Sequence, residues 1–109
     1  MPFLPVSDLR RSVDFYTDVL GFAVEVRGDV GFAIVARDEV RIGLRESSSN
    51  AGHGRCYCNL SRGISTLYDE LCSRAVRIQH EMQDEPYGMR EFTIVDPDQN
   101  QLHFGQPLP

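Results

Sequence analysis

The stretch FTIVDPDQNQLHF, from Phe92 to Phe104, repeats the pattern of an earlier stretch, FAIVARDEVRIGL, from Phe32 to Leu44. Phe92 follows Phe32 by 60 positions, and at this spacing Phe, Ile, Val and Asp recur at matching places. Each copy has the pattern of an apolar strand, a turn and a second strand. An internal repeat of this kind fixes the architecture, because each copy must fold as the same supersecondary unit.

The residues around the first copy predict one helix and three strands. Ser7 and Asp8 are suited to begin the helix, and Gly21 is suited to end it. Between them, apolar residues at spacings of four, three and four form one helical stripe: Leu9, Val13, Tyr16 and Leu20. The predicted strands of this half cover 22–26, 32–36 and 40–45.

The second half follows the same order. Its predicted strands cover 55–60, 76–82, 92–95 and 101–104. Between the first two of these strands lies a helix whose apolar face consists of Ile64, Leu67, Tyr68, Leu71 and Cys72.

Two copies of a strand–helix–strand–strand–strand unit predict an α+β fold. We expect a single domain over residues 1–109, with repeat one at about 1–46, a polar joint at 47–54 and repeat two at about 55–109. The two tandem βαβββ repeats should form curved mixed sheets, each covered by its helix on one face, with a cleft on the other side.

Alternation along the last strand of each repeat assigns the two faces of each sheet. Val40, Ile42 and Leu44 should point under the first helix, and Leu102 and Phe104 under the second. The residues between them should point to the open face: Arg41, Gly43 and Arg45 in repeat one, and Gln101, His103 and Gly105 in repeat two. Gly43 and His103 are therefore predicted to occupy equivalent positions on the cleft side.

Composition limits the class of protein. Apolar residues make up 41% and charged residues 25% of the 109 residues, which is typical of a soluble globular domain. The net charge of −5 argues against a nucleic-acid partner and favours cationic ligands. No apolar run is long enough for a membrane helix, and the N-terminus lacks the pattern of a signal peptide, so we expect a cytoplasmic protein.

The cysteines and two of the histidines do not form a recognisable site. Cys56 and Cys58 have no second cysteine pair that would complete a zinc site, and we expect all three cysteines, including Cys72, to be buried thiols. His53 in the joint and His80 on a predicted strand are expected to be surface residues. No nucleophile–base pair and no glycine-rich phosphate loop is present.

Three stretches of the chain resemble the vicinal oxygen chelate superfamily, which includes glyoxalase I, extradiol dioxygenases, fosfomycin-resistance enzymes and bleomycin-resistance proteins. They are VSDLRRSVDFYTDVLGF (Val6 to Phe22), RGISTLYDEL (Arg62 to Leu71) and YGMREFTIVDPDQNQLHF (Tyr87 to Phe104). The first is common across the superfamily, whereas the last two are similar to bleomycin-resistance proteins in particular. The resemblance covers essentially the whole chain.

The resemblance implies where a metal would bind in a metal-dependent member. The four ligand positions correspond to about Met1, Gly43, Tyr57 and His103. A divalent site needs at least three nitrogen, oxygen or sulfur ligands, and of these four residues only His103 is suited to that role. We therefore predict no metal, no cofactor and no catalytic residues. A metal-dependent enzyme of the glyoxalase or dioxygenase type is the alternative, and a metal-independent enzyme or ligand sensor is a third possibility.

Without a metal, the cleft is best interpreted as a binding site. Phe32, Tyr57 and Tyr87 can stack on flat ligand rings or cations, and plain packing of these rings is the competing interpretation. His103, Asn59 and Arg45 can supply hydrogen bonds. The resemblance implies a homodimer that sequesters a bleomycin-like antibiotic in clefts at the subunit boundary. It also suggests that Pro2 directs an N-terminal arm that exchanges between subunits.

The stretch DPDQN predicts a turn, although Asp96 and Asp98 could be mistaken for metal ligands. Aspartate side chains accept hydrogen bonds from nearby backbone N–H groups, and Pro97 fixes its own φ. Related proteins usually have glycine at the position of Gln99. If the turn requires a positive φ there, glutamine costs about 1 kcal/mol.

Overall fold

A computed structural model describes residues 1–28, 31–49, 51–52 and 54–109. Sheet one has the strand order β1 (Phe3–Val6), β4 (Val40–Glu46), β3 (Phe32–Arg37) and β2 (Ala23–Arg27), and sheet two has the order β5 (Arg55–Asn59), β8 (Gln101–Pro107), β7 (Met89–Val95) and β6 (Ile78–Glu85). In each sheet the first strand pairs in parallel with the last, and the other pairings are antiparallel. The predicted α+β fold of two βαβββ repeats is confirmed, while His53 lies outside the described residues.

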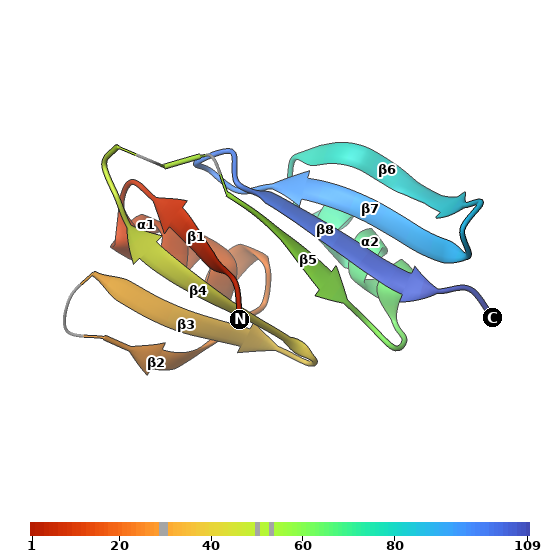
Figure 1. The fold of residues 1–109 in the computed structure, drawn as a ribbon, viewed down its shortest axis with the longest axis horizontal. Coiled ribbons are helices and arrows are strands. Elements are labelled where there is room, and N and C mark those ends of the chain that lie inside the picture. Colours follow the sequence, from red (N-terminus) through yellow and green to blue (C-terminus); the bar gives the residue numbers. More distant parts are fainter. Residues whose placement is uncertain (29–30, 50, 53) are drawn as a thin grey trace.

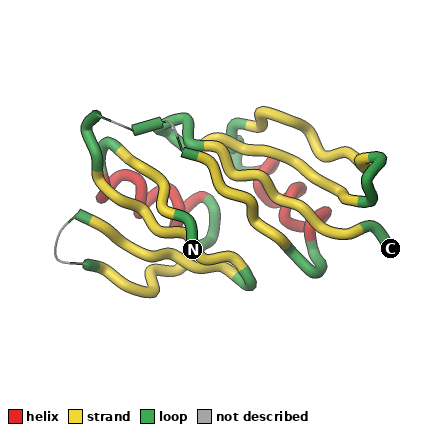
Figure 2. Tube along the Cα trace, viewed as in Figure 1, coloured by secondary structure: helices red, strands yellow, loops and turns green. Residues whose placement is uncertain are grey.

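The two sheets lie side by side, with β1 next to β5 (Figure 1). Helices α1 (Leu9–Asp14) and α2 (Ile64–Ser73) lie on the same side of the molecule, behind both sheets in Figure 2. The other side of each sheet carries no helix, and we call it the open face. None of the helices that the structure describes is long and apolar enough to cross a membrane.

The core lies between each sheet and its helix. The strand residues that alternation assigned to this side are buried, as predicted: Val40, Ile42, Leu44, Leu102 and Phe104. Cys56 and Cys58 also point into this core and are buried, with their Sγ atoms 3.7 Å apart. Cys72 is exposed, so the prediction that it is a buried thiol was wrong. Leu71 of α2 is buried, and Cys72 is the next residue along the helix. Consecutive residues of a helix point in different directions, so the Cys72 side chain faces outward.

The first helix begins as predicted and changes its winding halfway. Asp8 is the N-cap, and its Oδ1 accepts a hydrogen bond of 3.1 Å from the Arg11 N–H. A wider π-helical turn, η1 (Phe15–Val19), follows α1, and in it the Leu20 N–H donates to the Phe15 carbonyl. This turn keeps both Tyr16 and Leu20 in the core. Gly21, at φ 75°, then ends the helix.

The structural repeat differs by one residue from the repeat read in the sequence, and the difference lies in strands β3 and β7. Arg37 pairs with Val40 across a two-residue turn, whereas Val95 pairs with Gln101 across the longer turn 96–100. The spacing of 60 therefore holds for β4 and β8, but β3 and β7 are related by a spacing of 59. A one-residue shift moves a side chain to the other face of a sheet. Phe32 on the open face is thus the equivalent of Glu91, while Phe92 lies in the core.

The turn 96–100 is built by Asp96, as predicted. Its Oδ1 accepts hydrogen bonds of 2.9 Å from the N–H groups of Asp98 and Asn100. Asp98 points away from the turn toward repeat one, where its carboxylate accepts from the Ser7 hydroxyl at 2.6 Å and from Arg11 at 3.2 Å. Neither aspartate is placed as a metal ligand, because both are engaged by protein donors.

Gln99 has a φ of 70°, in the left-handed region that favours glycine. We expect Gln99→Gly to raise the free energy of unfolding by about 1 kcal/mol, because it relieves this backbone conformation. Urea denaturation of both proteins measures the difference. Gln79→Gly, at an exposed position of β6, is the matched control and should lower stability by about 0.5–1 kcal/mol. Equal losses in the two variants would contradict the prediction.

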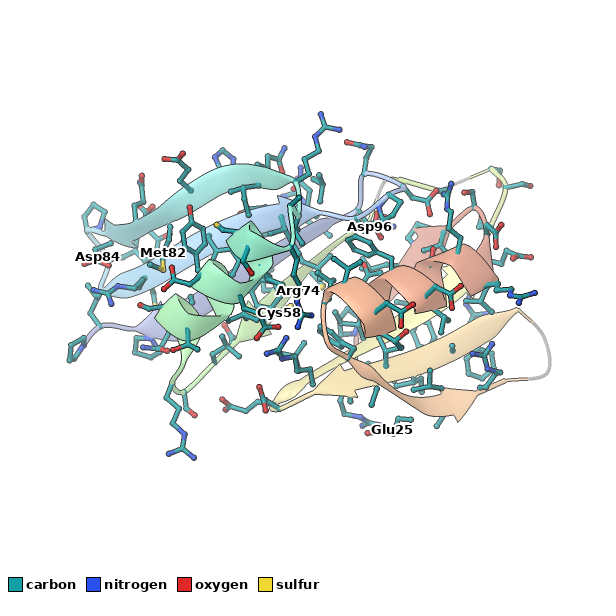
Figure 3. The ribbon with its side chains drawn as sticks, turned by 180° about the vertical axis from the view of Figure 1, so that it is seen from behind. Glu25, Cys58, Arg74, Met82, Asp84 and Asp96 are labelled. Atoms are coloured by element: carbon teal, nitrogen blue, oxygen red, sulfur yellow. The ribbon has the colours of Figure 1, made fainter. Side chains whose placement is uncertain are left out.

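The halves of the molecule are joined by polar contacts on the helix side. Arg37 of β3 makes two hydrogen bonds of 2.8 Å to the carboxylate of Glu70 on α2, and a third of 2.7 Å to the Leu20 carbonyl. Arg74, at the end of α2, donates to the Val19 carbonyl at 2.8 Å. In Figure 3 its side chain lies between the two helices. The contacts of Arg37 with Glu70 and of Arg74 with Val19 therefore cross the boundary between the two repeats.

The Arg37–Glu70 pair should make stability depend on pH. Its hydrogen bonds and charge lower the pKa of Glu70 below its usual range. The stabilisation is therefore present above the unfolded pKa and is lost as pH falls through the lower folded value. We expect Glu70→Gln to cost about 1 kcal/mol at pH 7 and almost nothing near pH 2. Urea denaturation at both pH values, with Asp69→Asn as the control, tests this; a cost that does not change with pH would contradict it.

Candidate functional site

The open face of sheet two carries a stacked aromatic pair. The rings of Tyr57 on β5 and His103 on β8 are 4.9 Å apart and inclined by 21°. Strand pairing causes this contact, because the two residues are opposite each other in the parallel register. Tyr57 is 67% exposed, so one face of its ring is free to meet a ligand.

Both ring nitrogens of His103 are held by neighbouring side chains. Nδ1 lies 2.8 Å from the Thr93 hydroxyl, and Nε2 lies 3.1 Å from Oε1 of Gln101. Burial, followed by the charge of Arg55, lowers the pKa of His103, so the ring is neutral at pH 7. A neutral ring donates from Nε2 to Gln101 and accepts at Nδ1 from Thr93. This leaves His103 as a fixed, flat surface rather than a free base or ligand.

Tyr87 extends the aromatic surface of sheet two and is tied to an acid. Its hydroxyl donates to Oε1 of Glu91, and this bond is the main cause that raises the pKa of Tyr87 to about 12. The ring is 67% exposed. Glu91 and His103 line a cavity of about 300 Å³ on this face, and four further polar side chains of its wall come from β6: His80, Glu81, Gln83 and Glu85. His80 is exposed, as predicted.

The open face of sheet one is built from two phenylalanines and an arginine. The rings of Phe3 and Phe32 meet edge to face at 6.3 Å. The Arg45 guanidinium lies 5.0 Å from the centre of the Phe3 ring and 5.9 Å from that of Phe32. Gly43 makes room for this arrangement, since a Cβ at that position would lie 2.4 Å from the Phe3 ring.

The equivalence of Met1 with Tyr57 was wrong. Phe3 pairs with Gly43 as Tyr57 pairs with His103, so Phe3 is the residue equivalent to Tyr57. The parallel register places Met1 two residues before the start of that pairing. With Phe3 in place of Met1, His103 is still the one residue suited to bind a metal at these four positions, because a phenylalanine ring supplies no ligand atom.

The predicted site residues therefore form two groups on separate sheets. Phe32 and Arg45 lie together on sheet one. Tyr57 and His103 lie together on sheet two, where Tyr57 is close enough to Tyr87 to contribute to the raised pKa of the Tyr87 hydroxyl. Asn59, at the end of β5, shares with Tyr57 the wall of a cavity of about 200 Å³ that also includes residues of β4.

Four residues on the two open faces were not predicted as residues of the site: Phe3, Glu91, Thr93 and Gln101. The spacing of 60 concealed Glu91 and Thr93, because it matched β3 with β7 one residue out of register. Gln101 was predicted to lie on the open face, but its hydrogen bond to His103 was not predicted. Phe3 could have been found only by knowing which residue of the first strand is opposite Gly43.

The residues at the four superfamily ligand positions do not fit a catalytic divalent metal. A phenylalanine, a glycine and a tyrosine accompany one imidazole whose nitrogens already have protein partners. Across 1–28, 31–49, 51–52 and 54–109, no three His, Cys, Asp or Glu side chains come together as a metal site would require.

Comparison with known proteins identifies the family. The family model described as the Glyoxalase/Bleomycin resistance protein/Dioxygenase superfamily matches residues 2–104. The chain belongs to this superfamily. Within it, a bleomycin resistance protein from Geobacillus stearothermophilus is 32% identical over 130 aligned residues, which cover 99% of this chain and 96% of that protein. The protein of the same name from Staphylococcus aureus strain N315 gives the same values. The alignment is longer than this chain of 109 residues, so these superfamily relatives contain inserted residues.

Solved structures of the superfamily share the fold. The bleomycin-binding protein from bleomycin-producing Streptomyces verticillus, in complex with copper(II)-bleomycin, has a TM-score of 0.79 and 28% identity, over 94% of this chain and 90% of that one. The bleomycin resistance determinant encoded on transposon Tn5 has a TM-score of 0.84 over 97% of this chain and 94% of that one, and at 24% identity it supports the fold alone.

Proposed function

We propose that the protein is a metal-independent homodimer that binds a bleomycin-like antibiotic and sequesters it without altering it chemically. The observation that carries this proposal is the Tyr57–His103 stack. At the position where metal-dependent members of the superfamily have a ligand, this chain has an imidazole fixed at both nitrogens and covered by a phenol ring. Such a surface suits stacking on a flat ring system. The 32% identity to bleomycin resistance proteins over nearly the whole chain supports the choice of antibiotic.

A homodimer would bring the two groups of site residues into one crevice. A two-fold axis can place the open face of sheet one from one protomer against the open face of sheet two from its partner, which creates two equivalent crevices. One wall would carry Phe3, Phe32 and Arg45, and the other Tyr57, Tyr87 and His103. The exposure of Phe3, 40%, and of the two tyrosines supports this pairing, because a partner and a ligand together would cover them.

The same dimer is compatible with exchange of the N-terminal arm. β1 pairs with β4 of its own chain, and the Gly43 N–H donates to the Pro2 carbonyl at 2.8 Å. In an exchanged dimer, the same ladder from Phe3 to Val6 would form with β4 of the partner. Pro2 supports the exchange because it has no N–H and its φ is fixed, so that it can direct the arm without losing a bond.

Titration calorimetry with metal-free bleomycin and with copper(II)-bleomycin tests the proposed function. We expect saturable binding of one antibiotic per protomer, with the ligand recovered unchanged by mass spectrometry. We also expect full binding by protein that has been stripped of metal with a chelator. A chemically altered ligand, or activity that requires a stoichiometric divalent metal, would instead support the metal-dependent enzyme of the same superfamily.

Tyr87 provides a test of the aromatic surface. We expect Tyr87→Ala to weaken bleomycin binding by about 1–3 kcal/mol, because it removes both the ring and the hydrogen bond that orients Glu91. Tyr87→Phe keeps the ring and should lose much less affinity, so the comparison separates stacking from orientation of the acid. Calorimetric affinities that match the parent in both variants would mean that Tyr87 only packs.

A further inference from the structure

The largest of the described cavities lies on the opposite side of the molecule from the open faces. It has a volume of about 630 Å³, compared with about 300 Å³ for the cavity beside His103. Its walls come from both repeats: the end of the first helix and the β3–β4 turn on one side, and the start of α2 and the loop before it on the other. This volume falls within the range of sites that hold small organic molecules.

The floor of this cavity is apolar. Its side chains come from repeat one and repeat two alike and are mostly buried in the core, so they present carbon atoms to the cavity between the two halves: Leu20, Phe22, Val40, Leu60, Leu67 and Leu71. An apolar surface of this kind holds water poorly, because water there finds few hydrogen-bonding partners.

The charged residues of the wall already face opposite charges. Arg37 is paired with Glu70 and lies 3.8 Å from Asp38. Glu39 accepts hydrogen bonds of 2.8 and 2.9 Å from the N–H and hydroxyl of Ser61, and the charge of Arg62 also helps to keep it ionised. A charged ligand would have to compete with these partners, whereas an uncharged ligand would leave them in place.

From these features we infer a second binding site, between the two repeats on the helix side, for a small uncharged molecule with an apolar body. Its contacts would be with the leucine and phenylalanine floor, and the Arg37–Glu70 and Glu39–Ser61 pairs would frame it at the rim. The site does not depend on the crevice proposed for the antibiotic or on a dimer, because every residue in it belongs to one chain.

The uncharged fluorescent probe N-phenyl-1-naphthylamine tests the inference, since its emission rises when it enters an apolar site. We expect saturable binding that Thr66→Trp weakens at least tenfold, because Thr66 lies exposed on α2 at the wall of the cavity and a larger ring there would fill it. Asp69→Trp, one turn further along the same helix and outside the cavity, is the matched control and should bind the probe as the parent does. Methyl signals of Leu67 and Leu71 should shift in carbon–proton NMR spectra when the probe is added.

The two sites can fail separately. Bleomycin should not displace the probe, and Thr66→Trp should bind bleomycin with unchanged affinity. Displacement of the probe by bleomycin, equal binding by the parent and Thr66→Trp, or no saturable binding would overturn the second site. If bleomycin does not bind but the probe still does and remains sensitive to Thr66→Trp, the second site stands and the proposed antibiotic does not.

Discussion

Asp96→Ala is expected to lower the free energy of unfolding by about 3–4 kcal/mol, the largest loss of stability that we predict for a single substitution in this chain. The carboxylate is buried and accepts four hydrogen bonds. Oδ1 accepts from the N–H groups of Asp98 and Asn100 at 2.9 Å. Oδ2 accepts from the Tyr16 hydroxyl at 2.9 Å and from Nδ2 of Asn100 at 3.0 Å.

The expected cost arises because the variant would leave buried donors without an acceptor. Tyr16 is fully buried on η1 in repeat one, so no water can replace the lost carboxylate easily. Asn100 keeps the bond from its Nδ2 to the Pro5 carbonyl at 2.8 Å and the bond that its Oδ1 accepts from the Gly54 N–H at 2.9 Å, but its own N–H loses the carboxylate. The contact therefore joins the first helix and β1 of repeat one to the last hairpin of repeat two. Figure 3 shows Asp96 close to the helix of repeat one.

Three further variants separate the contributions. Tyr16→Phe removes one donor together with its partner bond and should cost about 1–2 kcal/mol. Asp98→Ala should cost less than Asp96→Ala, because the main donors that it leaves without an acceptor, Ser7 and Arg11, are exposed and can bond to water instead. The Asp96→Ala, Tyr16→Phe double variant should be less destabilised than the sum of the two singles, measured by urea denaturation. Strict additivity, or a loss below about 1 kcal/mol for Asp96→Ala, would show that the buried carboxylate does not hold the halves together.

The order of the elements could be predicted because local pattern and repeat agreed. Alternation of apolar and polar residues in β4 and β8 placed the apolar residues on the helix side. The sequence of β1 alone is a weak signal for a strand, and the comparison with repeat two predicted it. Register could not be predicted in the same way. The hairpin turn of repeat two contains one more residue than matching letters suggest, and only the pairing of Val95 with Gln101 reveals it.

The sequence predicted candidate residues for the site, and these stay predictions, but it did not predict how the structure arranges them. Rings such as Tyr57, on β5, and Tyr87, in the turn between β6 and β7, are conspicuous in the sequence because large exposed aromatic side chains need a reason. Hydrogen-bond partners leave no such trace. Thr93 and Gln101 are ordinary strand residues whose contact with His103 depends on cross-strand neighbours. The position of Arg45 over Phe3 likewise follows from the parallel pairing of β1 with β4.

The second large effect concerns where the walls of the binding crevice come from. We expect the sheet-one variant Phe32→Ala, Arg45→Ala and the sheet-two variant Tyr57→Ala, His103→Ala each to bind bleomycin at least tenfold more weakly than the parent protein. If each crevice combines sheet one of one protomer with sheet two of its partner, a heterodimer of the two variants contains one crevice with no changes and one with all four.

Co-expression of the two variants with different affinity tags, followed by purification on both tags, isolates this heterodimer. Calorimetry should then find about one bleomycin site of parental affinity per dimer, half the parental stoichiometry. A doubly tagged dimer in which both chains carry the sheet-two changes is the control and should have no such site. If each crevice belonged to one chain, both crevices of the heterodimer would be damaged and high-affinity binding would not return. Failure to recover any doubly tagged dimer would contradict the homodimer itself, because the crevice requires the face that only a second copy supplies.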